Sequence, residues 1–183
     1  MTKICDNASV AALIFDHEGR LLVFDRNTDP PGVAGPAGHV DDHGGPMDAV
    51  CTEVFEEVGL TVMSAELVTG GWHPNQCRRL PGPRGVGHQW HVFRVEVAGE
   101  LNPSTRETRN ARWADRVELQ SLTHRTIDYA CGWLAYEEFR ARPGIEPVWL
   151  PTLVAVGLVD VAPEQMALFK ELIARPLPQG DRA

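Results

Sequence analysis

Three glutamates, Glu53, Glu56 and Glu57, occur at spacings of three and four residues just before Gly59. Residues at these spacings lie on one face of a helix, so a helical segment here brings three carboxylates together. Like charges in this arrangement destabilise a helix unless a positive charge lies among them. Mg²⁺ and Mn²⁺ take oxygen ligands, and Mg²⁺ commonly joins carboxylates to substrate phosphates. The triad therefore predicts a divalent-metal site for a phosphate compound; the alternative is an acidic helix face exposed to solvent.

The segments around the triad favour the metal site. Pro46 suits the first position of a helix and Gly59 the residue after its end, so we expect a helix over residues 46–58. Residues 30–45 are rich in glycine and proline, which predicts a shaped loop. Such a loop, entering a helix N-terminus, lets backbone N–H groups approach an anion. The helix is expected to pack by an apolar arc of Met47, Val50, Cys51, Val54, Phe55 and Val58.

Residues 38–60, GHVDDHGGPMDAVCTEVFEEVGL, resemble the Nudix box, G-x5-E-x7-R-E-U-x-E-E-x-G-U, in which U is a bulky aliphatic residue. An alignment without gaps places Gly38 at the first glycine of the pattern. The acids and Gly59 fill the tail of the pattern, together with Val54 and Leu60. The stretch ASVAALIFDHEGRLLVFDR upstream resembles the first hairpin of the family, and HQWHVFRVEV and ETRNARWADRVEL follow the box in the family order.

The resemblance covers roughly residues 8–120 and implies both a fold and an activity. The implied fold is α/β, a Nudix-type α/β/α sandwich with a mixed β-sheet, to which residues 121–183 add a helical extension. The implied activity is metal-dependent hydrolysis of the phosphoanhydride in a nucleoside diphosphate linked to another moiety. An ADP-ribose-like compound and a nucleoside triphosphate both remain open as substrates. The family's metal is expected to be Mg²⁺, with Mn²⁺ as an alternative, held by Glu53, Glu56, Glu57 and the carbonyl of Gly38.

Two positions depart from the box. Gly44 stands where the pattern has its first glutamate, and Thr52 stands where it has arginine. We hypothesise that Asp41 or Asp42, in the same loop, supplies the oxygen ligand that Gly44 lacks. The departures also leave a second function open, a catalytically weak or inactive module that binds or senses a nucleotide.

Residues outside the box are expected to complete the site. The loop at 72–88 carries Arg78, Arg79 and Arg84, whose guanidinium groups suit phosphate oxygens. Trp72 and Trp90 are suited to stacking on a base, and the alternative is a solvated loop with core tryptophans. Glu107 is our first candidate for an additional catalytic acid, ahead of Glu96, because it stands in a loop before a tryptophan-bearing strand.

Zinc is considered because His88 and His91 have a spacing found in metal sites, with His73 and Cys77 nearby. Residues 88–97 are predicted to form a strand, on which residues three apart point to opposite faces. We therefore expect His88 and His91 not to share a metal. The four cysteines, Cys5, Cys51, Cys77 and Cys131, include no C-x-x-C pair.

Composition bounds the class of protein. The chain has 183 residues and a net charge of −8, which fits one globular domain and argues against broad affinity for nucleic acid or membranes. It shows neither a signal peptide nor an apolar run long enough to cross a membrane, so we expect a cytoplasmic protein with a small-molecule nucleotide substrate. The tail is expected to be a packing extension, or else a lid or homodimer surface using exposed Trp133 or Trp149. Further strands are predicted at 8–15, 21–25, 62–70 and 111–114, and helices at 124–142 and 163–175.

Overall fold

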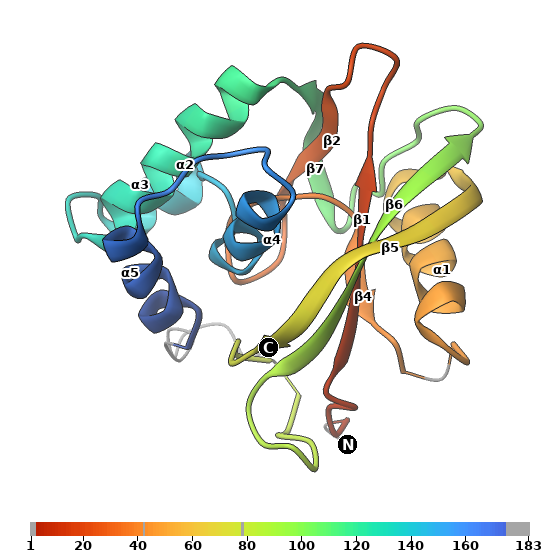
Figure 1. The fold of residues 1–183 in the computed structure, drawn as a ribbon, viewed down its shortest axis with the longest axis horizontal. Helices are drawn as coiled ribbons and strands as arrows, with labels where there is room; N and C mark the ends of the chain where they lie inside the picture. Colours follow the sequence, from red (N-terminus) through yellow and green to blue (C-terminus); the bar gives the residue numbers. More distant parts are fainter. Residues whose placement is uncertain (1–2, 42, 78, 175–183) are drawn as a thin grey trace.

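The computed structural model describes residues 3–41, 43–77 and 79–174, whose strands form two sheets (Figure 1). One sheet is mixed, with the order β4-β1-β6-β5, in which β1 and β6 run parallel. The other is antiparallel, with the order β3-β2-β7. The strands are β1 (Ala8–Ile14), β2 (Leu21–Arg26), β3 (Val33–Ala34), β4 (Ala37–His39), β5 (Thr61–His73), β6 (His88–Ala98) and β7 (Thr108–Ala114).

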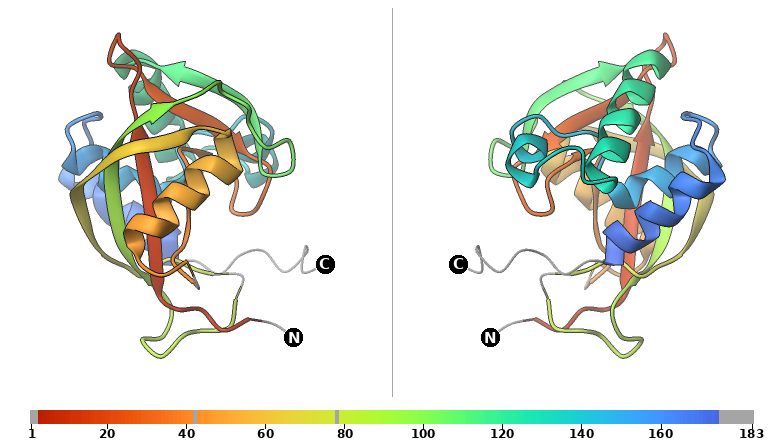
Figure 2. Two further views of the ribbon diagram at one scale, coloured as in Figure 1. Left: turned by 90° about the vertical axis from the view of Figure 1, so that its right-hand side faces the viewer. Right: turned by 90° about the vertical axis from the view of Figure 1, so that its left-hand side faces the viewer.

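Helices lie on both sides of the mixed sheet (Figure 2). Helix α1 packs on one side, against β1, β4 and β5, and the C-terminal helices lie on the other. This arrangement confirms the predicted α/β architecture with a mixed sheet between helices. The helices are α1 (Pro46–Val58), α2 (Arg116–Ala130), α3 (Tyr136–Ala141), the 3₁₀ helix η1 (Pro147–Trp149), α4 (Leu150–Ala155) and α5 (Pro163–Ala174).

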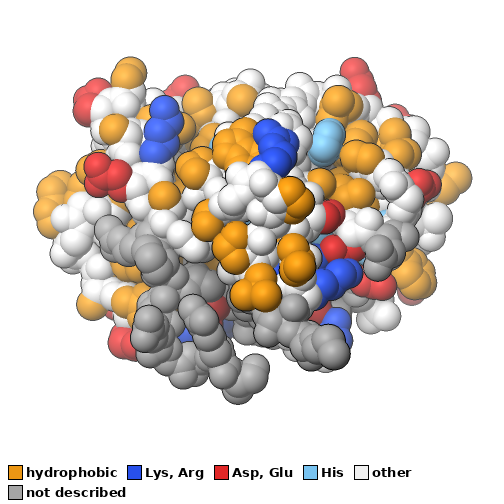
Figure 3. Space-filling view, turned by 90° about the horizontal axis from the view of Figure 1, so that it is seen from below, with side chains coloured by type: hydrophobic (Ala, Val, Ile, Leu, Met, Phe, Trp, Pro, Cys, Tyr) orange, Lys and Arg blue, Asp and Glu red, His pale blue; other side chains and the backbone are white. Residues whose placement is uncertain are grey.

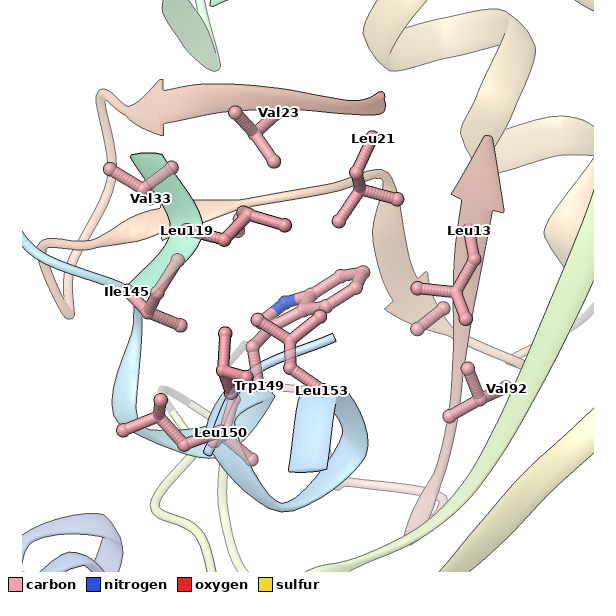
Figure 4. Packing of buried hydrophobic residues seen from close by; sticks show 14 of the residues in the cluster. Leu13, Leu21, Val23, Val33, Val92, Leu119, Ile145, Trp149, Leu150 and Leu153 are labelled. Carbon is pink, nitrogen blue, oxygen red and sulfur yellow. The ribbon is translucent and has the colours of Figure 1, made fainter. Parts of the chain in front are cut away.

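Strand β1 supplies both hydrophobic layers of the protein. Successive side chains of a strand point to opposite faces. Val10 and Ile14 accordingly pack in the core beneath α1, whereas Ala11 and Leu13 pack in the core around Trp149. Figure 4 shows the second core, where the Trp149 ring lies among aliphatic side chains from both sheets and the C-terminal helices. A strand buried on both faces explains why residues 8–14 contain almost no polar side chain.

The predicted first hairpin is wrong in its pairing. Both strands and the intervening turn are present, and the Asp16 carboxylate stabilises the turn by accepting from the backbone N–H groups of Glu18 and Arg20. However, β1 and β2 belong to different sheets and meet only at an isolated bridge between Phe15 and Leu21. The turn therefore carries the chain from one sheet to the other.

Helix α1 begins and ends as predicted. Gly45 is the N-cap, Pro46 follows it, and Gly59 ends the helix in the left-handed region at φ 72°. The predicted apolar arc is wrong for Phe55 and Met47, which are 63% and 46% exposed, whereas Glu57 is buried. The helix is thus rotated so that its inward arc includes an acid of the triad.

The C-terminal region differs from its prediction in two ways. The single helix expected over 124–142 is two helices, α2 and α3, separated by a break at Gly132, which has φ 77°. Trp149, which the lid or homodimer alternative placed on the surface, is 3% exposed and belongs to the core, whereas Trp133 is 78% exposed. The remaining elements lie near their predicted positions, although β5 continues to His73 and β7 starts at Thr108.

Two surface properties bear on possible partners. No helix in the described ranges is long and apolar enough to span a bilayer. Figure 3 views the molecule from below relative to Figure 1, where the β5–β6 loop lies. On that face the Lys and Arg side chains are scattered among acidic and hydrophobic ones.

Candidate active site

A cavity of about 500 Å³ brings the predicted acids together with the C-terminal helices. Its acidic side consists of Glu53, Glu56 and Glu57 of α1, next to Gly38 of β4. The extension beyond residue 120 supplies a mostly apolar part of the lining. The residues of that part include Tyr129, Tyr136, Phe139, Pro147, Val148, Leu172 and Ile173.

Glu57 is the most deeply placed acid of the triad. Only 9% of this residue is exposed, and its Oε2 atom accepts a hydrogen bond of 2.9 Å from the backbone N–H of Ala37. Burial raises the pKa of Glu57 to about 8, against the lowering effect of the Ala37 N–H, and the charge of Glu53 raises it further. The orientation of α1, which turns Glu57 inward, therefore places this carboxylate next to the backbone of β4.

Glu53 depends on the absence of a side chain at Gly38. A Cβ atom added to Gly38 would lie 1.7 Å from Glu53 Oε1, so the carboxylate packs directly against the backbone of β4. Burial raises the pKa of Glu53 to about 7, and the charges of Glu56 and Glu107 add to the effect. Gly38 was predicted as a carbonyl ligand, which stays a prediction; what the structure shows is a steric role. Glu56 is exposed on the same helix.

The chemistry of these acids fits a hard divalent cation. In the described ranges, no Lys or Arg forms an ion pair with any of the three glutamates. Their carboxylates line one cavity, although no three described acids bring their oxygens within 4.8 Å of one another. Mg²⁺ suits such an open arrangement, because it retains several waters and shares its coordination sphere with substrate phosphates.

Glu107, predicted as an additional catalytic acid, lines the same cavity. Its charge raises the pKa values of both Glu53 and Glu57, and it forms an ion pair with Arg106. Glu96, the lower-ranked candidate, accepts a hydrogen bond from the Ser64 hydroxyl and does not line the cavity.

The predicted arginine cluster is divided by the structure. Arg79 lines the cavity and forms a bidentate pair with Asp41, including a 2.8 Å bond from Nη2 to Oδ2. Arg84 instead lies over the Trp72 ring, 4.1 Å from its centroid, and neither residue lines the cavity. Arg78 lies outside the described residues.

The two positions that depart from the box, Gly44 and Thr52, have distinct local environments. Gly44 adopts φ 93°, a backbone conformation that a glutamate rarely takes, and the Thr52 hydroxyl donates to the Asp48 carbonyl one turn earlier. Asp41 lines the cavity but is held by Arg79, whose hydrogen bonds lower the pKa of the carboxyl to about 2. Asp42, the other hypothesised ligand, lies outside the described residues.

Sequence reasoning missed two features of the cavity. Arg26, at the end of β2, lines it and forms an ion pair with buried Glu146. The extension supplies the apolar part of its lining, which the mixed composition of that region did not indicate. Trp90 lines the cavity as well, with its indole Nε1 donating to Asn75 Oδ1 at 3.3 Å.

Comparison with known proteins gives a family and a fold. A family model described as NUDIX domain matches residues 6–143. A MutT NUDIX hydrolase from Burkholderia pseudomallei is 22% identical, with 61% of this chain and 83% of that chain covered at a TM-score of 0.50. A NUDIX hydrolase from Nitrosomonas europaea is also 22% identical, with 63% of this chain and 76% of that chain covered at a TM-score of 0.50. At these identities the likeness shows the fold, and a search of curated proteins gave no match.

Proposed function

This chain belongs to the NUDIX domain family of hydrolases, and from that membership we propose that it is a divalent-metal-dependent pyrophosphohydrolase. Its substrate is a nucleoside diphosphate linked to another moiety, and the bond cleaved is a phosphoanhydride. The observation that carries the proposal is the pair Glu53 and Glu57, two carboxylates at the cavity wall with no cationic side chain paired to them among the described residues. When both acids are ionised they need a cation, and a diphosphate needs one too.

In this proposal the residues of the chain have distinct roles. Glu53, Glu56 and Glu57, with the Gly38 carbonyl, would hold Mg²⁺ or Mn²⁺, which when bound would neutralise phosphate charge and acidify the attacking water. Glu107 accepts the proton of the attacking water as a general base, and a member of the triad is the alternative. Water then adds to phosphorus as the bridging oxygen leaves.

The remaining walls of the cavity position the substrate. Arg79 provides a planar donor for phosphate oxygens, once it exchanges part of its pairing with Asp41. The aromatic side chains Tyr136 and Phe139 provide an apolar surface for a base or for the attached group. These two sides of the cavity match a substrate that is anionic at its centre and flat at one end.

The test is a phosphate-release screen over nucleotide sugars, dinucleotides, coenzyme A and nucleoside triphosphates, each with Mg²⁺ or Mn²⁺. We expect turnover of at least one compound, and its loss in Glu53→Gln and Glu57→Gln. Glu66→Gln is the matched control, because Glu66 is exposed on β5 and outside the cavity. Undiminished activity in both cavity variants would contradict the mechanism. A flat screen with ligand binding still seen by thermal shift would instead favour a nucleotide-binding module.

A further inference from the structure

A second group of ligand-type side chains lies beside the acidic site. Cys5, His39, Cys77 and His88 direct one donor atom each to a common point, and these four atoms all lie within 4.8 Å of one another. The two imidazoles present the same atom, Nε2, at a separation of 3.2 Å. Cys5 Sγ lies 3.2 Å from His88 Nε2, and Cys77 Sγ lies 3.4 Å from His39 Nε2.

Three of the six donor-to-donor separations, 3.2, 3.2 and 3.4 Å, are close to the edges of a tetrahedral metal site, and the other three are within 4.8 Å. Zinc binds imidazole nitrogen at about 2.0 Å and thiolate sulfur at about 2.3 Å, which places tetrahedral ligands about 3.3–3.8 Å apart. Two Cys and two His form one of the common closed ligand sets of structural zinc. The set contains no carboxylate, so its softer donors distinguish it from the acidic site next to it.

Neighbouring groups orient the donors for a metal. Asn75 Oδ1 lies 2.9 Å from His88 Nδ1 and 3.3 Å from the Trp90 indole nitrogen. An indole N–H only donates, which identifies the Asn75 atom as an acceptor and requires His88 Nδ1 to carry a proton. The lone pair of His88 is therefore on Nε2, at the centre of the group. This support for a histidine through its other ring nitrogen is typical of metal ligands.

The thiols are supported in a similar way by the backbone. The N–H of Asn7 donates to Cys5 Sγ, and the N–H of Arg79 donates to Cys77 Sγ, each at 3.3 Å. Burial raises the pKa of the Cys5 thiol to about 11 and outweighs the lowering effect of the Asn7 N–H, so a bound cation is what would hold Cys5 as the thiolate that binds metal. A disulfide between the two cysteines would leave the paired imidazoles unexplained, whereas a cation uses all four residues.

We propose that Cys5, His39, Cys77 and His88 bind one Zn²⁺ as a structural site, independently of the reaction at the acids. The ligands come from the N-terminal segment, the end of β4, the β5–β6 loop and the start of β6. The ion thus ties the N-terminal segment and the loop to the mixed sheet, next to the cavity. The same two segments are already joined by the Cys5 N–H, which donates to the Leu80 carbonyl at 2.9 Å.

The site also connects to the substrate-binding side of the cavity. Three of the ligands, His39, Cys77 and His88, line the cavity, and Arg79 follows Cys77 by two residues. Zinc is therefore expected to fix the segment that presents Arg79. It also provides a physical reason for a loop rich in glycine and proline to hold one conformation.

The first test is metal content. Protein purified under reducing conditions from zinc-supplied cells, then dialysed against metal-free buffer, is expected to retain about one Zn²⁺ per chain. Cys77→Ser and His88→Asn are expected to lose it. Cys131→Ser, an exposed thiol elsewhere, is the matched control and should retain it. Glu53→Gln, Glu57→Gln should retain it as well, which separates this site from the acids.

A second measurement does not depend on the folding of variants. Replacing zinc with Co²⁺ in the wild-type chain is expected to give the strong visible bands of a tetrahedral site and a thiolate charge-transfer band. Wild-type protein that is zinc-free after this purification, or Co²⁺ spectra without a thiolate band, would overturn the proposal. A Cys5–Cys77 disulfide that persists in reducing buffer would overturn it too.

Discussion

The acidic group and the Cys–His group differ in the hardness of their donor atoms and in whether the protein fills every coordination position. The acidic group of α1 offers carboxylate oxygens, and one of its members, Glu56, remains exposed. The Cys–His group offers sulfur and nitrogen, and all of its donor atoms come from the protein within one small sphere. An open oxygen site leaves coordination positions for substrate and water, whereas a closed site of softer donors excludes both. A reactive metal and a structural metal thus have different requirements, and three of the four Cys–His ligands line the same cavity as the acids.

Strand β4 is where the two groups meet. Gly38 leaves room for the Glu53 carboxylate, and the next residue, His39, contributes an imidazole to the Cys–His group. Because neighbouring residues of a strand point to opposite faces, one short strand can serve two sites without mixing their ligands. The comparison therefore predicts that changes on one face of β4 alter only one of the sites.

The largest effect is expected from Gly38→Ala. The added Cβ would lie 1.7 Å from Glu53 Oε1, which forces this carboxylate away from β4. A displacement of about 1 Å in a catalytic group lowers activity on the order of 10²-fold, so we expect at least that loss in kcat/KM with Mg²⁺. Gly45→Ala is the matched control, because its Cβ would come no closer than 3.9 Å to Asp48. Equal activity in the two variants would show that the packing of Glu53 on Gly38 does not matter.

The acidic site was predictable from the sequence because its members are local. The caps of α1 and the spacing of Glu53, Glu56 and Glu57 lie within a single helix, so periodicity alone brings them together. The orientation of that helix in the fold could not be predicted from its sequence. Burial of Glu57 in place of Phe55 depends on the position of Ala37, which tertiary packing decides.

The Cys–His group was not predictable, because its members are far apart in sequence. Cys5 and His39 meet Cys77 and His88 only after β1, β4 and β6 assemble. Sequence spacing suggested instead a pair formed by His88 and His91. Both residues lie on β6, three positions apart, so their side chains point to opposite faces of the sheet. The same limitation explains the hairpin error, since the residues of β1 and β2 are equally suited to pairing with each other and with other strands.

The next effect concerns stability in the absence of divalent metal. The folded-state pKa values of Glu53 and Glu57, about 7 and about 8, lie above the ordinary value of 4.5. The folded chain then binds more protons than the unfolded chain, so the free energy of unfolding falls as pH rises through these values. We expect a loss on the order of 6 kcal/mol between about pH 5 and 8 in urea unfolding, because each unit of pKa difference corresponds to about 1.4 kcal/mol. Added Mg²⁺ should reduce this loss.

Glu57→Gln tests the source of that pH dependence. An amide cannot ionise, so the variant should lose less stability over the same pH range than the wild type does. Glu66→Gln, on the exposed side of β5, should keep the wild-type dependence. A wild-type slope in Glu57→Gln would show that burial of this carboxylate is not the cause.

A smaller effect is expected when the support of the Cys–His group is changed. Asn75→Ala removes the acceptor for His88 Nδ1 without removing a proposed ligand. Loss of such a partner lowers metal affinity about 10–100-fold, and competition with a chromophoric chelator measures it for Zn²⁺. Gln76→Ala is the control, since its amide donates to the Ala174 carbonyl instead. Unchanged zinc affinity in Asn75→Ala would separate the amide from the metal site.

The smallest effects distinguish the two arginines that the sequence placed together. Arg79→Ala should raise KM about tenfold, because its side chain lines the cavity, while its backbone N–H to Cys77 is kept. Arg84→Ala should change KM less than about twofold, because a cation–π contact with Trp72 contributes only about 0.5–1 kcal/mol to local stability. Steady-state kinetics on the substrate found in the screen measures both. A KM increase in Arg84→Ala equal to that in Arg79→Ala would mean that the loop moves toward the cavity when substrate binds, and the two sides of the loop would then no longer act separately.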